Sequence, residues 1–169
     1  DGLVLIDQHA AHERVLYAQL GRGGKMASQA LLVPETVDLG FREAQALEPL
    51  LPALREVGLE AEPFGGNTLV VKSAPAMLSG RELRPLIVEI AAAAASAGEA
   101  APFDALDRCR QIAACHGAIR ARQALSIEQM QALLRQMDEC ANLSHCPHGR
   151  PTWLRYDTRV IERAFKRTL

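Results

Sequence analysis

Aromatic residues are scarce in this sequence, where they make up 4% of 169 residues. So few rings leave little surface on which unpaired bases could stack, which argues against a protein that binds single-stranded nucleic acid. An excess of positive charge is also lacking, because 19 basic side chains are balanced by 20 acidic ones. Any contact with nucleic acid must therefore be local or depend on partner proteins, since bulk attraction is excluded.

Long apolar runs are absent as well. None approaches the roughly 20 residues that a membrane-spanning helix needs, and no basic-then-apolar leader opens the chain. We therefore expect a soluble, cytoplasmic protein with no membrane partner. The chain has four cysteines, and thiols in such a compartment usually stay reduced, so metal binding or catalysis is a better hypothesis for them than disulfide formation.

Apolar residues make up 49% of the chain, enough for the core of one domain or of two small lobes. Residues 2–6 form a continuous apolar run that predicts a buried strand, and from Gln8 onward the apolar spacing becomes that of a helix. Farther along, the sequence predicts an edge strand or bulge around Pro34, a helix over 41–57 that prolines bend or divide, and strands flanking a tight turn at 65–67. Three helices are predicted next, over 81–97, 103–124 and 127–140. A strand over 152–156 and a last helix capped by Asp157 complete the prediction.

The first candidate site is the run D-Q-H-A-A-H-E at residues 7–13. A strand ends there on the carboxylate of Asp7, and His9 and Glu13 follow one helical turn apart on one face. An imidazole and a carboxylate at that spacing can share one divalent ion. In the structural alternative, which is the commoner case for an arbitrary sequence, Asp7 caps the helix and the other two form a surface pair.

The second candidate site is the run C-P-H-G-R-P at residues 146–151. Proline and glycine fix a tight loop there, while a thiol and an imidazole stand two residues apart in a combination that favours zinc. Taken alone, the run fits equally well a turn with a buried thiol. Together the two runs predict one metal site that joins distant parts of the chain, with His9, Glu13, Cys146 and His148 as its ligands.

Four motifs occur in order along the chain: D-Q-H-A-A-H-E at 7–13, A-C-H-G-A-I-R-A at 114–121, C-P-H-G-R-P-T at 146–152 and F-K-R at 165–167. Together they resemble the C-terminal dimerisation domain of bacterial MutL-type DNA mismatch repair proteins that have endonuclease activity. The resemblance implies a homodimer that nicks duplex DNA with the help of a divalent metal. It also implies that the ATP site lies in a domain outside this segment, and that the mismatch-recognition protein is met through the full-length protein.

The resemblance further implies roles for individual residues. The metal positions are Asp7, His9, Glu13, Cys146 and His148, and the catalytic positions are Asp7, Glu13 and Cys115. A zinc or manganese ion flanked by Asp7 and Glu13 would activate water and stabilise charge on the attacked phosphodiester. Alternatively, zinc is structural or regulatory while manganese supports the cut.

Two positions depart from the family pattern. The first motif usually continues with a second glutamate where this chain has Ala18, and the second usually has arginine or lysine where His116 stands. A protonated histidine could still contact phosphate. The departures leave a non-catalytic dimerisation module with a structural or regulatory zinc site as the alternative function, and an unrelated small zinc-binding domain as a third.

Two further segments carry candidate partner sites. Residues 29–34 fit Q-x-x-L-x-P, which is similar to the family's sliding-clamp-binding peptide, and Gln29, Leu32 and Pro34 would enter an apolar groove of the clamp. In the alternative, this is an edge strand whose leucines face the core. The candidate contacts to duplex DNA are Arg150, Arg155 and Arg167, although a solvated basic face is the default interpretation of such charge.

For the architecture we expect an α+β protein of two lobes in an in-out-in arrangement, because the metal motifs near both ends of the sequence must converge. Residues 1–27 and 146–169 would form an inner dimerisation lobe of strands and helices. Residues 28–145 would form an inserted, mainly helical regulatory lobe with a hairpin. The hypothesis requires that the helix after the first strand meet the C-P-H-G loop around a shared cation.

Overall fold

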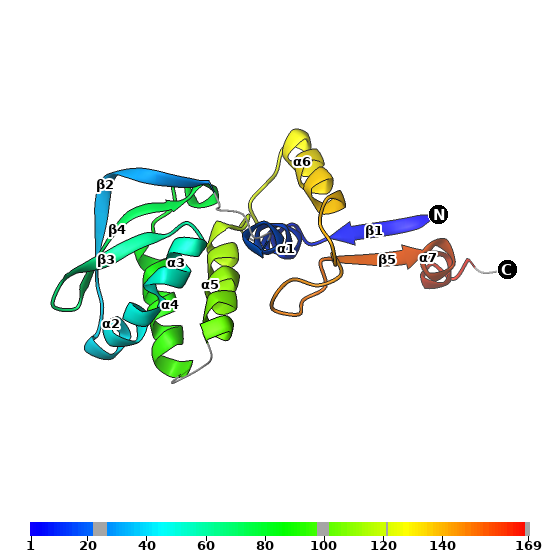
Figure 1. The fold of residues 1–169 in the computed structure, drawn as a ribbon. Coiled ribbons are helices and arrows are strands. Elements are labelled where there is room, and N and C mark those ends of the chain that lie inside the picture. Colours follow the sequence, from blue (N-terminus) through cyan, green and yellow to red (C-terminus); the bar gives the residue numbers. More distant parts are fainter. Residues whose placement is uncertain (22–26, 98–101, 121, 168–169) are drawn as a thin grey trace. The chain divides into compact units, whose positions relative to one another are not determined.

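The chain folds into two units that each combine helices with antiparallel strands (Figure 1), so the expected α+β class is confirmed. The computed structural model describes residues 1–21, 27–97, 102–120 and 122–167. Unit 1 consists of Asp1–Ala18 and Ala118–Leu169, and unit 2 of Gln19–Gly117. Residues 118–145 thus belong with the ends of the sequence, whereas we expected them in the inserted lobe. The dimerisation and regulatory roles of the two lobes stay predictions.

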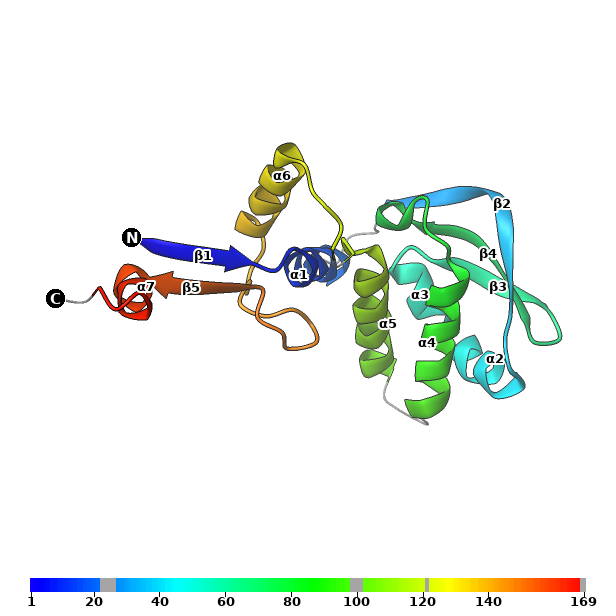
Figure 2. The same ribbon diagram turned by 180° about the vertical axis from the view of Figure 1, so that it is seen from behind.

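Unit 1 contains a two-stranded antiparallel sheet of β1 (Gly2–Ile6) and β5 (Trp153–Asp157). Gly2 pairs with Asp157 and Ile6 with Trp153, so the end of β1 lies beside the start of β5 (Figures 1 and 2). Both strands are exposed along their whole length. The expectation of a buried first strand is therefore wrong for this chain by itself, because the described residues leave the faces of this small sheet uncovered.

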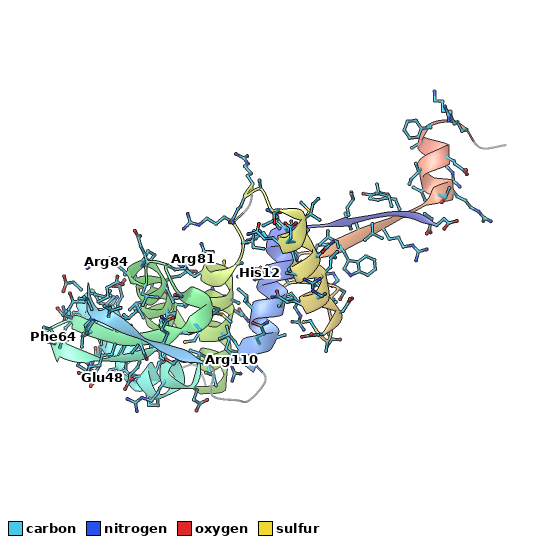
Figure 3. The ribbon with its side chains drawn as sticks, turned by 90° about the horizontal axis from the view of Figure 1, so that it is seen from above. His12, Glu48, Phe64, Arg81, Arg84 and Arg110 are labelled. Atoms are coloured by element: carbon cyan, nitrogen blue, oxygen red, sulfur yellow. The ribbon has the colours of Figure 1, made fainter. Side chains whose placement is uncertain are left out.

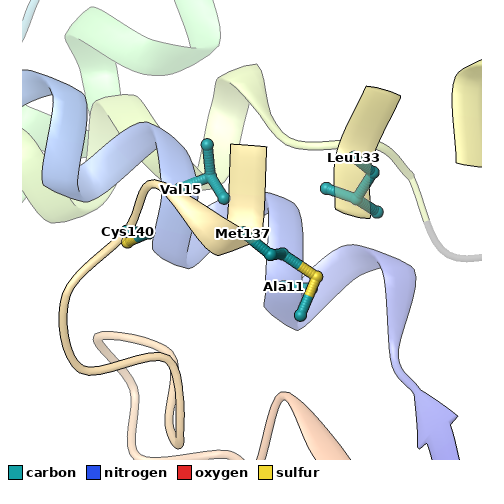
Figure 4. Close-up of a cluster of buried hydrophobic side chains, with 5 residues drawn as sticks. All are labelled: Ala11, Val15, Leu133, Met137 and Cys140. Carbon is teal, nitrogen blue, oxygen red and sulfur yellow. The ribbon is translucent and has the colours of Figure 1, made fainter. Parts of the chain in front are cut away.

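Unit 1 contains α1 (Gln8–Gly21) as far as Ala18, together with α6 (Ile127–Asp138) and α7 (Thr158–Ala164). The first two pack through a cluster of buried side chains from both helices and the residue at the exit of α6, shown in Figure 4: Ala11, Val15, Leu133, Met137 and Cys140. These contacts fix α6 against the face of α1 that the apolar spacing predicted to be buried.

The caps of α6 and α7 differ from each other. Ser126 begins α6 with a capping box, in which its hydroxyl accepts from the N–H of Gln129 and the Gln129 side chain accepts from the N–H of Ser126. Asp157 stands at the N-cap of α7, but its side chain makes no capping hydrogen bond. It accepts instead from Arg155 Nε at 3.0 Å, so the predicted cap is present in position only.

Unit 2 contains a three-stranded antiparallel sheet in the order β2 (Ser28–Asp38), β4 (Thr68–Pro75), β3 (Glu60–Gly65). The strand β2 is an edge strand, and its pairing with β4 shifts register between Ala30 and Glu35. This shift brackets Pro34, and the predicted edge strand with a bulge is therefore confirmed. The predicted hairpin is confirmed as well, because β3 and β4 flank a turn in which Gly65 and Gly66 have positive φ.

Four α-helices of unit 2 are α2 (Phe41–Leu47), α3 (Leu51–Glu56), α4 (Arg84–Ala97) and α5 (Pro102–Gly117). A 3-10 turn at Glu48–Leu50 separates α2 from α3, as the prolines predicted, and a second one at Ala76–Leu78 was not predicted. The helix α5 ends at Gly117 rather than at the predicted Ala124. Among the described helices, none combines the length and apolarity needed to cross a bilayer.

Cys109 lies buried on α5, and burial raises the pKa of its thiol to about 11. This pKa lies above the ordinary value of about 8.5 that the thiol has in the unfolded chain, so the folded state binds the proton more tightly. The resulting stabilisation of the fold is fully present below a pH of about 8.5, and it is lost as pH rises through about 11. We expect the free energy of unfolding to fall by about 2 kcal/mol more in the wild type than in Cys109→Ala between pH 9 and pH 11. Denaturant titrations at both pH values measure this difference, and parallel losses in the two proteins would contradict it.

Candidate metal centre

The two motifs that lie far apart in the sequence meet at one end of the β1–β5 sheet. Because the strands are antiparallel, the residue after β1 lies next to the residue before β5, and the N–H of Asp7 donates to the carbonyl of Thr152 at 2.9 Å. The helix α1 begins directly after Asp7, and the C-P-H-G-R-P loop ends directly before Thr152. The pairing of the strands therefore brings the start of α1 to the loop.

Asp7 caps α1. Its Oδ1 accepts from the N–H of His9 at 2.9 Å and from the N–H of Ala10 at 3.1 Å. These bonds satisfy two of the backbone donors that a helix start leaves unpaired, so the capping alternative considered from the sequence is present. The helix then carries His9 and Glu13 on one face, one turn apart.

The loop at 146–151 is closed by its own backbone. The N–H of Cys146 donates to the carbonyl of Arg150 at 2.8 Å, and the N–H of Gly149 donates to the carbonyl of Cys146 at 2.9 Å. Gly149 has φ of 78°, a left-handed conformation that glycine adopts without the strain of a side chain. This turn fixes the backbone from which the side chains of Cys146 and His148 project.

One carboxylate, one thiol and one imidazole converge where α1 meets the loop. The ligand atoms of Glu13, Cys146 and His148 all lie within 4.8 Å of one another. Glu13 is 2% exposed and Cys146 is buried, whereas the side chain of His148 is 40% exposed. Oxygen, sulfur and nitrogen donors in this combination are those that zinc accepts in proteins.

The contact between Glu13 and His148 is unusual for an ion pair. Nδ1 of His148 lies 2.6 Å from Oε1 of Glu13, yet this buried oxygen has no partner in hydrogen-bond geometry. A buried carboxylate oxygen without a hydrogen bond is costly, and a cation bound to the Glu13 carboxylate would satisfy it. The donor set and the unsatisfied oxygen therefore both fit a metal ion.

The protonation of the Cys146 thiol depends on its burial and on the groups next to it. Burial raises the pKa of its thiol, the backbone of Arg150 opposes the rise, and the neighbouring Glu13 carboxylate adds to it. The thiol is thus protonated at neutral pH in the absence of a cation, and a metal that binds there must displace the proton.

Two of the five predicted metal positions lie outside this three-residue cluster. Asp7 serves as a helix cap through Oδ1, and Nδ1 of His9 is bonded to the carbonyl of Ile119 at 2.8 Å. Their part in metal binding stays a prediction. The structure thus brings together three predicted ligands, and it shows further uses for the other two.

The first motif binds the backbone after α5, a partner that was not predicted from the sequence. Ile119 donates its N–H to Nδ1 of His12 at 2.9 Å, and Nε2 of Gln8 donates to the carbonyl of Gln123 at 2.7 Å. His9 binds the same segment, and Figure 3 shows His12 on α1. A signal was present in the sequence, because Gln8 and His12 are polar residues of a motif whose metal role did not require them.

The departures from the family pattern have local explanations. Ala18 packs against the buried cluster between α1 and α6, where a small apolar side chain fits. Nε2 of His116 lies 2.8 Å from Oε2 of Glu89, so this imidazole contacts a carboxylate of α4. Cys115 lies on α5 in unit 2, whereas the Glu13 cluster belongs to unit 1, and a catalytic role for Cys115 stays a prediction.

The predicted partner residues are exposed. Arg150, Arg155 and Arg167 are open to solvent, and Arg155 pairs with Asp157. On β2, Gln29, Leu32 and Pro34 are exposed too, and Leu32 is among the most exposed large apolar residues described. The alternative in which the leucines of this edge strand face the core is therefore wrong for Leu32.

The sequence is similar to that of known proteins over nearly its whole length. Residues 1–125 match the family model of the MutL C-terminal dimerisation domain. Proteins named DNA mismatch repair protein MutL match 99% of this chain: 42% identity in Rhizorhabdus wittichii, 42% in Syntrophobacter fumaroxidans and 41% in Azorhizobium caulinodans, over 29%, 25% and 27% of their own lengths. The chain thus spans less than a third of the length of these relatives. Since the family model covers most of the chain and the relatives cover nearly all of it, the chain belongs to the MutL C-terminal dimerisation domain family.

Proposed function

We propose that this chain is the C-terminal domain of a DNA mismatch repair protein, that it forms a homodimer, and that the Glu13, Cys146 and His148 cluster holds a divalent metal ion for nicking duplex DNA. The observation that carries the metal part is the convergence of the Glu13 carboxylate, the Cys146 thiol and the His148 imidazole, whose ligand atoms all lie within 4.8 Å of one another. The relatives' printed name, DNA mismatch repair protein MutL, supports the biological setting.

Glu13, Cys146 and His148 would hold the ion from the protein side, and His9, one turn before Glu13, is the proposed fourth ligand. A bound divalent ion supplies Lewis acidity, which lowers the pKa of a water ligand and offsets charge on an attacked phosphodiester. Glu13 and Cys146 exclude solvent from the inner side because both are buried. The exposed edge of His148 leaves the outer side open to a large polyanion.

Exposed positive charge on unit 1 supports duplex DNA as the substrate. Arg150 follows His148 by two residues and is exposed, as are Arg155 and Arg167. Guanidinium groups pair well with phosphate oxygens, and such contacts position a backbone without reading its sequence. We propose that these arginines hold the duplex near the cluster while the nearly neutral remainder of the chain adds little attraction.

A homodimer is supported by the exposed faces of the β1–β5 sheet. The register places Leu3 opposite Tyr156 and Leu5 opposite Leu154, so one face is entirely apolar, and its four side chains are 39–49% exposed. A sheet of two strands is marginal in water unless something covers it. A second copy presenting the same face would cover it, which agrees with the family's description as a dimerisation domain.

Nicking of a supercoiled plasmid in the presence of manganese tests the catalytic proposal. We expect Glu13→Gln to nick at least about tenfold more slowly than the wild type, because the variant loses an anionic ligand, and Asp7→Asn to be slower too. Glu43→Gln, which changes a carboxylate of unit 2, serves as the matched control and is expected to nick at the wild-type rate. Equal nicking by all four proteins would remove the endonuclease assignment and leave a dimerisation module with a structural zinc site.

We also propose that the exposed bulge of β2 binds a sliding clamp. Burial of a leucine side chain in an apolar groove contributes about 1.5–3 kcal/mol, so Leu32→Ala is expected to weaken clamp binding by about 10- to 100-fold. The adjacent Val33 is also exposed but lies between the motif positions, which makes Val33→Ala the matched control. Titration of the clamp with each variant measures the effect, and equal losses in both would contradict the proposed motif.

A further inference from the structure

The backbone of Ile119 is bound on both sides by histidines of α1. Its N–H donates to Nδ1 of His12 at 2.9 Å, and its carbonyl lies 2.8 Å from Nδ1 of His9. All three residues belong to unit 1. The two histidines of the first motif thus contact opposite backbone groups of a single residue more than 100 positions away in the sequence.

These two contacts assign opposite tautomers to the two rings. A carbonyl oxygen only accepts, so Nδ1 of His9 must carry the proton, and Nε2 of the neutral ring has a lone pair. A backbone N–H only donates, so Nδ1 of His12 must be unprotonated, and the proton of that neutral ring is on Nε2. The Ile119 backbone therefore selects a proton acceptor at Nε2 of His9 and a proton donor at Nε2 of His12.

The tautomer of His9 is the one that a cation site needs at this place. His9 stands one turn before Glu13 on the same face of α1, and only an unprotonated ring nitrogen can bind a metal. Histidine ligands commonly donate their other N–H to a backbone carbonyl, which fixes both the ring orientation and the tautomer. The contact between His9 and Ile119 has this form.

We infer that His12 is a positioning residue of the metal centre: it holds Ile119 in place, and the carbonyl of Ile119 in turn fixes His9 with its Nε2 lone pair presented to the cation site of Glu13. The inference rests on the proposed metal-dependent function. The bond from Gln8 Nε2 to the carbonyl of Gln123 at 2.7 Å supports it, because this bond anchors the same segment by a separate contact.

Two-bond ¹⁵N–¹H correlation spectra of histidine-labelled protein, recorded at a pH of about 8 where an ordinary imidazole is neutral, report the tautomer of each ring. We expect an unprotonated Nε2 for His9 and an unprotonated Nδ1 for His12 in the metal-free wild type. In His12→Leu, which has no acceptor for the N–H of Ile119, His9 is expected to become a mixture of tautomers. Zinc affinity is expected to fall by about tenfold in this variant.

A matched pair of variants separates positioning from packing. In His12→Asn the side-chain oxygen lies near the place of Nδ1 and can accept from Ile119, so the His9 spectrum and zinc affinity are expected to stay as in the wild type. In His12→Gln the oxygen lies near the place of Nε2, and both readouts are expected to change as in His12→Leu. The Gln variant also serves if the Leu variant does not fold.

A protonated Nε2 on His9 in the wild type would overturn the inference, as would an unchanged His9 spectrum in a folded His12→Leu or His12→Gln variant. These outcomes are distinct from failure of the proposed function. A protein with the expected tautomers that does not nick DNA would contradict only the catalytic proposal. A protein that nicks DNA with the opposite His9 tautomer would contradict only the positioning role of His12.

Discussion

Cys146→Ser is expected to weaken zinc binding by about 10²- to 10³-fold. Structural zinc sites with four ligands bind with about 10–16 kcal/mol, or roughly 2.5–4 kcal/mol for each ligand, and 1.4 kcal/mol corresponds to a tenfold change in affinity. Cys146 supplies the sulfur of the described cluster, and a serine hydroxyl does not ionise to replace a thiolate. The loss should therefore approach the full contribution of one ligand.

Competition with a chromophoric chelator measures this affinity, and substitution with cobalt(II) adds a direct readout, because a thiolate ligand produces an intense charge-transfer absorption. Cys109→Ala changes another buried cysteine, one that lies on α5 outside the cluster, and both signals are expected to persist in this control. Equal zinc affinity for Cys146→Ser and the wild type would show that the thiol is only a packing group.

Leu154→Glu is expected to raise the dissociation constant of the homodimer by about 10³-fold. Burying one leucine contributes about 1.5–3 kcal/mol, and in a symmetric dimer each substitution acts twice, so about 3–6 kcal/mol is lost before the cost of burying the carboxylates is counted. Leu154 is one of the four side chains on the apolar face of the β1–β5 sheet and lies opposite Leu5. It is half exposed in the single chain, and the substitution therefore leaves little of the monomer's own packing to disturb.

Sedimentation equilibrium over a wide range of protein concentrations measures the association. Leu32→Glu makes the same chemical change at an exposed leucine of β2 in unit 2 and is expected to leave the mass unchanged. If Leu154→Glu and Leu32→Glu had the same dimer affinity as the wild type, this sheet would not be the interface. A purely monomeric wild type at micromolar concentration would contradict the proposed homodimer itself.

The meeting of the two metal motifs could be predicted because short-range rules fix both partners. An apolar run predicted β1, helix spacing predicted α1, and proline with glycine predicted the turn around Cys146. The contact between α1 and the loop is non-local, and the shared zinc chemistry of Glu13, Cys146 and His148 predicted it, whereas the pairing of β1 with β5 that produces it was not predicted. The metal-binding chemistry of the residues thus predicted a long-range contact that apolar periodicity cannot predict.

The remaining differences arise where the partner of a group is not visible in the sequence. An apolar run such as that of β1 indicates a strand but not what covers it, and in the single chain nothing described does so. The end of α5 at Gly117 and the grouping of residues 118–145 with unit 1 depend on side chains that bind backbone. Gln8, His9 and His12 recognise carbonyl and N–H groups that every residue possesses, so no pattern in the sequence marks their targets.

The pairing of β1 with β5 also sets a delay during synthesis. Their partner residues are separated by about 150 positions, which a ribosome translates in roughly 8 to 30 s at 5–20 residues per second. All of unit 2 is synthesised within that interval and can fold first. During this time the backbone of β1 has no partner strand with which to form hydrogen bonds. The β1 strand therefore lacks its pairing partner until β5 has been synthesised, and at this stage a chaperone would protect an unpaired apolar segment.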